Sequence, residues 1–225
     1  MRIFDSRSAL AETLARDVAS VLAARIKAQG EAVLAVSGGS TPVLFFEALS
    51  RVGLEWSRIV VTLVDERWVP ESNPRSNAAL VRRHLLVGEA SAARFIPLYN
   101  GEPTPIAGIA ALTSSLAAQK LPLAAAILGM GEDGHTASFF PGGDHLEAAL
   151  NPDLEDLLIT MTAPGAIEPR MTLTLPVLAQ ANFIALHIEG ERKREILARA
   201  QAKGPVADMP VRAVLRHSPA IYWCP

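Results

Sequence analysis

Four short runs of branched and small apolar residues constrain the fold of this chain more than any other feature. Each run is five or six residues long and nearly free of charge, which is typical of strands buried on both faces of a sheet. Segments with helical spacing separate the runs, and strands that alternate with helices indicate a mostly parallel sheet. The runs are residues 32–36, 59–64, 123–128 and 183–188.

The segments between these runs complete an α/β pattern. Apolar residues recur at helical spacing between residues 6 and 28, with charges on the other face, and Gly30 ends the segment. We therefore predict an α/β fold with a doubly wound, mostly parallel sheet and helices on both faces. Shorter helices are expected to include residues 45–49, 80–85, 109–116 and 196–197, and further strands residues 157–162, 170–176 and, at the sheet edge, 220–223.

Length and composition bound the organisation and the partners. The 225 residues, 50% of them hydrophobic, favour a single domain over residues 1–225, with the loop at 99–105 as the best boundary between two lobes. A net charge of -2 gives no electrostatic case for nucleic acid or an anionic membrane as partner. The single cysteine, Cys224, and the absence of an apolar run long enough for a signal core or a bilayer span predict a cytoplasmic protein. We expect a monomer or a weak homodimer.

Residues 123–141, LAAAILGMGEDGHTASFFP, lead from a buried run into the loop with the clearest chemical character. Closely spaced glycines let this backbone turn sharply and approach a ligand. Asp133 and His135 stand among them, and open α/β sheets bind ligands in the loops beyond the carboxyl ends of their strands. We expect Thr136 or Ser138 to cap a helix that follows. The alternative is a Gly-rich turn and a capped helix that carry an ordinary surface histidine.

Residues 37–42, SGGSTP, follow the run at 32–36 in the same way. Pro42 suits the first turn of a helix and Ser40 or Thr41 is a natural cap, so amides and hydroxyls would converge as they do where helix starts hold phosphate. Neither GxGxxG nor the Lys-bearing P-loop is present, so the motif indicates no dinucleotide or ATP site and leaves a small phosphorylated ligand open. The alternative is an ordinary strand-to-helix turn.

Charged residues stand directly after the run at 59–64. Asp65, Glu66 and Arg67 follow its last residue, and Trp68 comes next to cover them. This position again places polar chemistry at the carboxyl end of a strand. The alternative is a solvated loop with a local ion pair.

Two basic residues in the C-terminal half suggest an anionic ligand. Arg170 opens the segment at 170–176, and Lys193 falls in the first turn of a helix, where the helix dipole disfavours a cation. Glu191 and Glu195 could instead neutralise Lys193. His187 alternates within a strand, and we interpret it as structural.

Taken together, these motifs resemble the 6-phosphogluconolactonase family. The resemblance runs in order from about Ala32 to Lys193, through SGGSTP, DERWVP followed by Ser76-Asn77, LGMGEDGHTASFFP, RMTLTLP and the turn at 190–193. It implies hydrolysis of 6-phospho-D-glucono-1,5-lactone to 6-phosphogluconate in the oxidative pentose phosphate pathway. It also implies a Rossmann-like fold shared with glucosamine-6-phosphate deaminases, and no required cofactor.

Hydrolysis of an ester-like bond gives each candidate a role. The reaction needs a base to activate water and donors for the oxyanion. We expect His135 to be the base, Asp133 to orient it, and Arg67 with Gly-rich backbone amides to stabilise the oxyanion. A metal centre is less attractive, because the sequence offers no convincing third ligand beside Asp133 and His135. The residues expected to bind the substrate or its phosphate are Gly38, Gly39, Ser40, Thr41, Asp65, Gly131, Arg170 and Lys193.

Two other functions share this pattern. A glucosamine-6-phosphate deaminase or isomerase would use the same scaffold, and related deaminases place a glutamate just before the proline that closes the Asp-Gly-His motif. This chain has Phe140 there. A non-catalytic sugar-phosphate-sensing module is the second alternative, but the predicted α/β unit uses the whole chain and leaves no separate DNA-binding domain.

Overall fold

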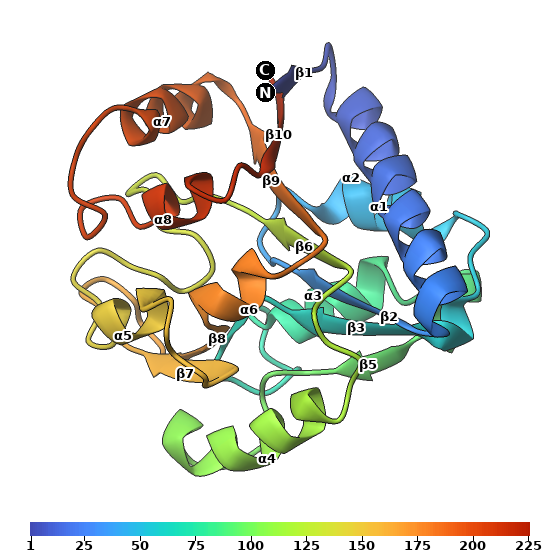
Figure 1. Cartoon of the computed structure of the whole chain (residues 1–225), viewed down its shortest axis with the longest axis horizontal. Coiled ribbons are helices and arrows are strands. Elements are labelled where there is room, and N and C mark those ends of the chain that lie inside the picture. The colour runs from blue at the N-terminus through green and yellow to red at the C-terminus, as the bar shows by residue number, and fades with distance from the viewer.

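A seven-stranded sheet runs through the middle of the molecule in the computed structural model, which describes residues 1–225 (Figure 1). Every neighbouring pair of its strands is parallel, as predicted. In spatial order the strands are β1 (Arg2–Ile3), β10 (Ala220–Cys224), β9 (Phe183–Glu189), β6 (Ala125–Leu128), β2 (Ala32–Val36), β3 (Ile59–Leu63) and β5 (Arg94–Ile96).

The order of these strands confirms the doubly wound topology. From β2 the chain adds β3 and β5 on one side, and then crosses back to place β6, β9 and β10 on the other. The winding therefore reverses between β2 and β6, where Val36 is paired with Ile127 near the carboxyl ends of the two strands. In open α/β sheets the crevice at such a switch point is where ligands bind.

Helices cover both faces of the sheet. α1 (Arg7–Gln29) and α2 (Val43–Ser50) pack against each other on one side, and α6 (Leu175–Ala179), α7 (Glu191–Gln201) and α8 (Val211–Leu215) lie on the other (Figure 1). α1 ends at Gly30 as predicted, with a φ of 82° at that glycine, and it begins after Ser6, whose hydroxyl accepts the Ala9 N–H at 3.2 Å. The remaining helices are α3 (Asn77–His84), α4 (Pro105–Ala117), α5 (Leu146–Leu150) and the 3-10 turns η1 (Trp56–Arg58) and η2 (Gly88–Ala92).

A second, three-stranded antiparallel sheet is absent from the sequence-based prediction. β4 (Asp65–Arg67) pairs with β8 (Arg170–Leu173), which also pairs with β7 (Leu158–Met161). The solvated-loop alternative for residues 65–67 is therefore wrong, and Asp65 and Glu66 are buried. Residues 65–67 are all charged and show no apolar alternation that would predict a strand. They form one because they pair with β8, which lies about a hundred positions further along the chain.

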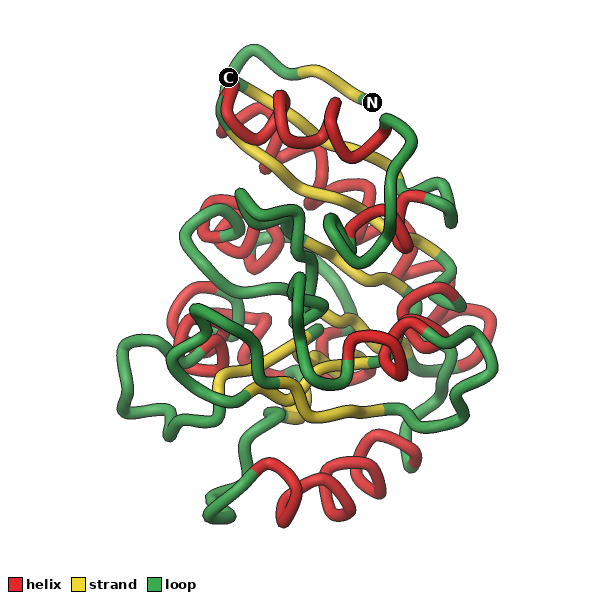
Figure 2. The backbone as a smooth tube through the Cα atoms, turned by 90° about the vertical axis from the view of Figure 1, so that its left-hand side faces the viewer, coloured by secondary structure: helices red, strands yellow, loops and turns green.

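The strand near the C-terminus forms as predicted, but it does not lie at the edge. β1 pairs with β10 on its outer side, with Arg2 beside Tyr222, so the two termini lie close together at one end of the molecule (Figure 2). Two residues are too few to show a period, which is why β1 is not predicted. None of the helices combines the length and apolar character needed to cross a bilayer.

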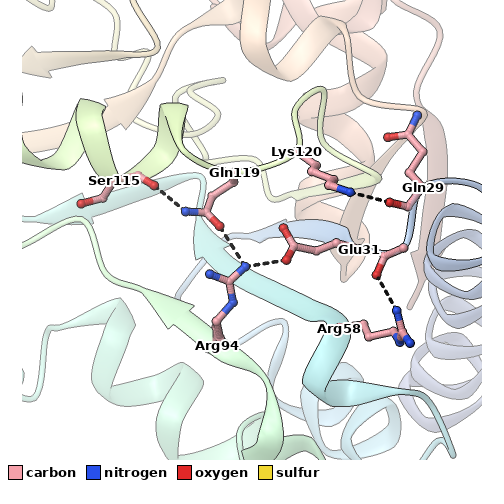
Figure 3. Close-up of polar contacts among 8 residues, drawn as sticks. Gln29, Glu31, Arg58, Arg94, Ser115, Gln119 and Lys120 are labelled. Carbon is pink, nitrogen blue, oxygen red and sulfur yellow. Dashed lines mark hydrogen bonds and ion pairs between the residues drawn. The ribbon is translucent and has the colours of Figure 1, made fainter.

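A polar network ties together the amino ends of the strands, at the edge opposite the switch point (Figure 3). Arg94, at the start of β5, donates to Glu31 at 2.6 Å and to Gln119 at 3.1 Å. Lys120 donates to the carbonyl of Gln29, the last residue of α1, at 2.7 Å. These contacts lie at the amino ends of the strands, whereas the largest group of polar side chains around a cavity lies at the carboxyl ends.

Candidate active site

A cavity of about 350 Å³ lies at the switch point. Its wall is built by the turns that follow β2 and β6, by β4 and β8, and by the end of β9 and the first turn of α7. The structure brings ten of the eleven predicted site residues to this wall, and the eleventh, Asp133, contacts His135. The ten are Gly38, Gly39, Ser40, Thr41, Asp65, Arg67, Gly131, His135, Arg170 and Lys193.

The loop after β6 fixes His135 through Asp133. The Gly131 N–H donates to the His135 carbonyl at 2.8 Å, which closes the loop into a compact turn. Nδ1 of His135 lies 2.5 Å from the Asp133 carboxylate, and the His135 backbone N–H donates to the same oxygen at 3.1 Å. Because a carboxylate can only accept, Nδ1 carries the proton and Nε2 is left able to accept one.

The electrostatics of this pair favour a charged carboxylate. Burial acts to raise the pKa of Asp133, but the hydrogen bonds and the charge of His135 outweigh burial and lower that pKa below its ordinary value. Gly131 is also part of the arrangement, since a Cβ there would lie 2.1 Å from Nδ1 of His135 and 2.6 Å from the Asp133 carboxylate. Only glycine lets the imidazole lie against this backbone.

The helix expected after this loop does not form. Ala137 has a φ of 50°, which is incompatible with a right-handed helix, and residues 136–139 form a turn. The hydroxyls expected to cap the helix bind elsewhere: Thr136 donates to the Gly129 carbonyl at 2.7 Å and Ser138 to the Asp65 carboxylate at 2.6 Å. Ser138 thereby ties the loop after β6 to β4.

The turn after β2 presents backbone donors, although its expected caps are absent. α2 begins at Val43 with Pro42 at its N-cap, and neither Ser40 nor Thr41 accepts a hydrogen bond from the helix. The backbone N–H groups of residues 38–41 donate to no acceptor within the protein. Together with the hydroxyls of Ser40 and Thr41, they form a donor-rich turn suited to an anion.

Two arginines lie side by side on neighbouring strands of the second sheet. Arg67 and Arg170 are directly paired between β4 and β8, and like charges in that position repel. Arg170 is only 7% exposed, its buried Nε has no hydrogen-bond partner, and its guanidinium lies 5.6 Å from the centre of the Phe140 ring. Burial lowers the pKa of Arg170, while Asp65 opposes that shift and Arg67 adds to it. An anion bound here would relieve both the repulsion and the missing bonds.

Lys193 adds a third cation to the cavity. It lies half-buried in the first turn of α7, and burial lowers its pKa, opposed by the charges of Glu132 and Asp133. The neutralisation alternative is wrong, because Glu191 pairs with Arg194 at 3.5 Å and Glu195 with Arg192 at 3.3 Å. Lys193 thus brings an ammonium without an ion pair to the cavity from the first turn of α7.

Some of the lining residues were not predicted. Asn77 of α3 accepts from Arg67 at 3.1 Å, and Phe140 lies with its ring centre 4.6 Å from that of His135. His187, interpreted as structural, is buried on the cavity wall and lies 3.2 Å from Glu189, which also pairs with Arg7. Alternation shows which side of β9 carries His187, but only the strand order shows that this side meets the cavity.

No three His, Cys, Asp or Glu side chains are grouped to hold a metal ion.

The fold places at its switch point a cavity lined by cations and unpaired backbone donors, which suits a small anionic ligand. The family model described as glucosamine-6-phosphate isomerases/6-phosphogluconolactonase matches residues 5–223. The chain belongs to this family.

Individual relatives agree with that assignment. A curated protein from Rhizobium meliloti named 6-phosphogluconolactonase is 54% identical over 100% of this chain and 98% of its own length. One of the same name from Mesorhizobium japonicum is 49% identical over 99% and 94%. The crystal structure of a 6-phosphogluconolactonase from Shewanella baltica is 40% identical, covers 100% of this chain and 97% of that one, and superposes with a TM-score of 0.96.

Proposed function

We propose that this chain hydrolyses 6-phospho-D-glucono-1,5-lactone to 6-phospho-D-gluconate, in the oxidative pentose phosphate pathway and without a cofactor. The proposal is supported by the curated relatives named 6-phosphogluconolactonase, which match the chain over nearly their full length. The unit that acts is one domain over residues 1–225, working in the cytoplasm as a monomer or weak homodimer. Its partner is a small phosphorylated sugar lactone, with no role for nucleic acid or membrane.

One observation favours lactone hydrolysis over the amino-sugar deamination that is the other reaction of the family. The Phe140 ring lies against His135, with the ring centres 4.6 Å apart and the planes 45° apart. Ring opening of an amino sugar needs a proton delivered to the ring oxygen, and a phenyl ring can neither donate one nor orient the imidazole by a hydrogen bond. A lactone already offers an electrophilic carbonyl, so water can attack before any proton reaches the ring oxygen. The proton that this oxygen needs later is the one that His135 has taken from the water.

The proposed reaction uses His135 as general base. Its Nε2 takes a proton from water as the water oxygen attacks the lactone carbonyl, and Asp133 holds the imidazole and stabilises the imidazolium that forms. Arg67 and backbone N–H groups of the Gly-rich turns stabilise the negative oxygen of the tetrahedral intermediate. The bond from the carbonyl carbon to the ring oxygen then breaks, and His135 returns the proton to that oxygen.

The phosphate is assigned to the basic side of the cavity. Arg170 brings a buried guanidinium with an unpartnered Nε, and Lys193 brings an ammonium with no ion pair. The turn at residues 38–41 adds donors that no protein acceptor uses. Charge-assisted bonds of this kind are the strong ones in phosphate recognition. Asp65 and Gly131 complete the lining on the side of the sugar ring.

The test gives the purified protein two substrates in turn. Acid production from 6-phosphogluconolactone is followed above its spontaneous hydrolysis, and ammonia release is followed from glucosamine 6-phosphate. We expect accelerated acid production and no ammonia. Ammonia without accelerated acid production would assign the chain to the deaminases, and neither activity would support a sensing module.

A further inference from the structure

Glu66 carries a carboxylate that is completely buried beside the cavity, yet it forms no ion pair. It is 0% exposed and belongs to β4, between Asp65 and Arg67, which both line the cavity. Burial raises the pKa of Glu66, and hydrogen bonds from three backbone N–H groups oppose that shift. An isolated buried carboxylate is unfavourable unless its hydrogen bonds are satisfied, so its partners explain what it does.

Four donors converge on this carboxylate. Oε1 accepts the backbone N–H of Arg67 at 2.8 Å and that of Asn77 at 2.9 Å. Oε2 accepts the backbone N–H of Ala78 at 2.8 Å and the hydroxyl of Ser76 at 3.1 Å. All four lie on β4 or at the start of α3, so the side chain joins the strand to the helix.

The two segments joined in this way carry side chains that line the cavity. The Arg67 guanidinium donates to the Asn77 side chain at 3.1 Å and to the Arg75 carbonyl at 2.7 Å. The Asn77 amide donates to the Asp65 carbonyl at 2.9 Å. The Asn77 side chain also packs directly against Gly38, where an added Cβ would lie only 1.9 Å from the Asn77 oxygen. The positions of Arg67 and Asn77 are therefore interlocked.

Capping of α3 does not by itself account for Glu66. The Ser76 hydroxyl already caps the helix by accepting the Ala79 N–H at 3.2 Å. We propose that Glu66 is a positioning residue, whose buried carboxylate holds β4 against the start of α3 and so fixes Arg67 and Asn77 on the cavity wall. This inference rests on the proposed lactone hydrolysis, to which Glu66 contributes by positioning other residues without touching the substrate.

Glu66→Gln is the direct perturbation. Both carboxylate oxygens accept backbone N–H groups, so the amide nitrogen faces a donor whichever way the side chain is turned. We expect kcat for the phosphorylated lactone to fall by about 10- to 100-fold, the range expected when a group that aligns the reaction is displaced by up to about 1 Å, with KM little changed. Glu66→Asp keeps the charge and should retain more activity than Glu66→Gln. It replaces Glu66→Gln as the test variant if the glutamine protein does not fold.

A double-mutant cycle with Arg67→Met separates positioning from general stability. If Glu66 acts through Arg67, Glu66→Gln should reduce kcat by less than about threefold in the Arg67→Met protein, because coupled residues are not additive. Full additivity would overturn the inference. The matched control is Glu31→Gln in the network at the opposite edge of the sheet (Figure 3), which should lower the melting temperature and leave kcat unchanged. A Glu66→Gln protein that likewise loses only stability would also overturn the inference.

Crystal structures of the wild type and Glu66→Gln separate this inference from the proposed function. An Arg67 guanidinium displaced in the variant supports the positioning role, and an unmoved guanidinium contradicts it, even where the wild type shows no lactonase activity. A wild-type protein without lactonase activity would overturn the proposed function alone.

Discussion

Replacing Gly131 with alanine should disable the base without unfolding the protein. The added Cβ would lie 2.1 Å from Nδ1 of His135, 2.2 Å from its Cε1 and 2.6 Å from the Asp133 carboxylate. Ordinary contacts begin at 3.4 Å, so the imidazole must move by about 1.3 Å. Misplacement of about 1 Å costs roughly 100-fold in rate, or about 2.7 kcal/mol of transition-state stabilisation.

The measurement compares kcat, KM and melting temperature of Gly131→Ala with those of the wild type. Gly131 is not among the glycines with positive φ, so alanine can adopt its backbone, and we expect the melting temperature to change little. Gly53→Ala is the matched control, because a Cβ there meets nothing within 4 Å, and it should keep full activity. A folded Gly131→Ala protein with kcat within about twofold of the wild type would show that the reaction does not depend on the His135 position described here.

Further predictions concern the phosphate site and pH. Arg170→Ala or Lys193→Ala should raise KM for the phosphorylated lactone far more than for the unphosphorylated one, and equal effects on both would contradict the assignment of the phosphate to these residues. The lowered pKa of Asp133 means that its bond to His135 contributes stability above about pH 4, and that this contribution is lost as the pH falls through the lowered pKa. Urea unfolding from about pH 6 to about pH 3 should therefore show the stability difference between wild type and Asp133→Asn shrinking with acidification. A difference independent of pH would refute that linkage.

Much of the fold follows from local patterns. The run at residues 32–36 coincides with β2, and the helix from Arg7 ends at the predicted glycine. Patterns of this kind are visible because buried parallel strands need uninterrupted apolar residues, and amphipathic helices need a 3.6-residue period. The rule that ligands bind beyond the carboxyl ends of strands then gathers residues that are far apart in the chain, such as Ser40, His135 and Lys193.

The parts that were not predicted depend on distant partners. β4 becomes a strand only through β8, and the hydroxyl of Ser138 binds Asp65 instead of capping a helix. Asn77 and Glu66 are positioned by contacts between β4 and α3, and the spacing of apolar residues in the sequence does not predict such contacts. Side-chain hydrogen bonds compete with helix formation, and a single sequence does not show which of the two prevails.

The most direct measurement of the central claim is acid release from 6-phosphogluconolactone in a pH-stat, with the wild type and His135→Ala run beside the spontaneous reaction. General-base catalysis is commonly worth about 100- to 10,000-fold. We therefore predict that the wild type accelerates hydrolysis strongly, and that His135→Ala lowers kcat by about 100-fold or more with KM little changed. A folded His135→Ala protein with near-normal turnover would remove His135 from the base role and contradict the proposed mechanism.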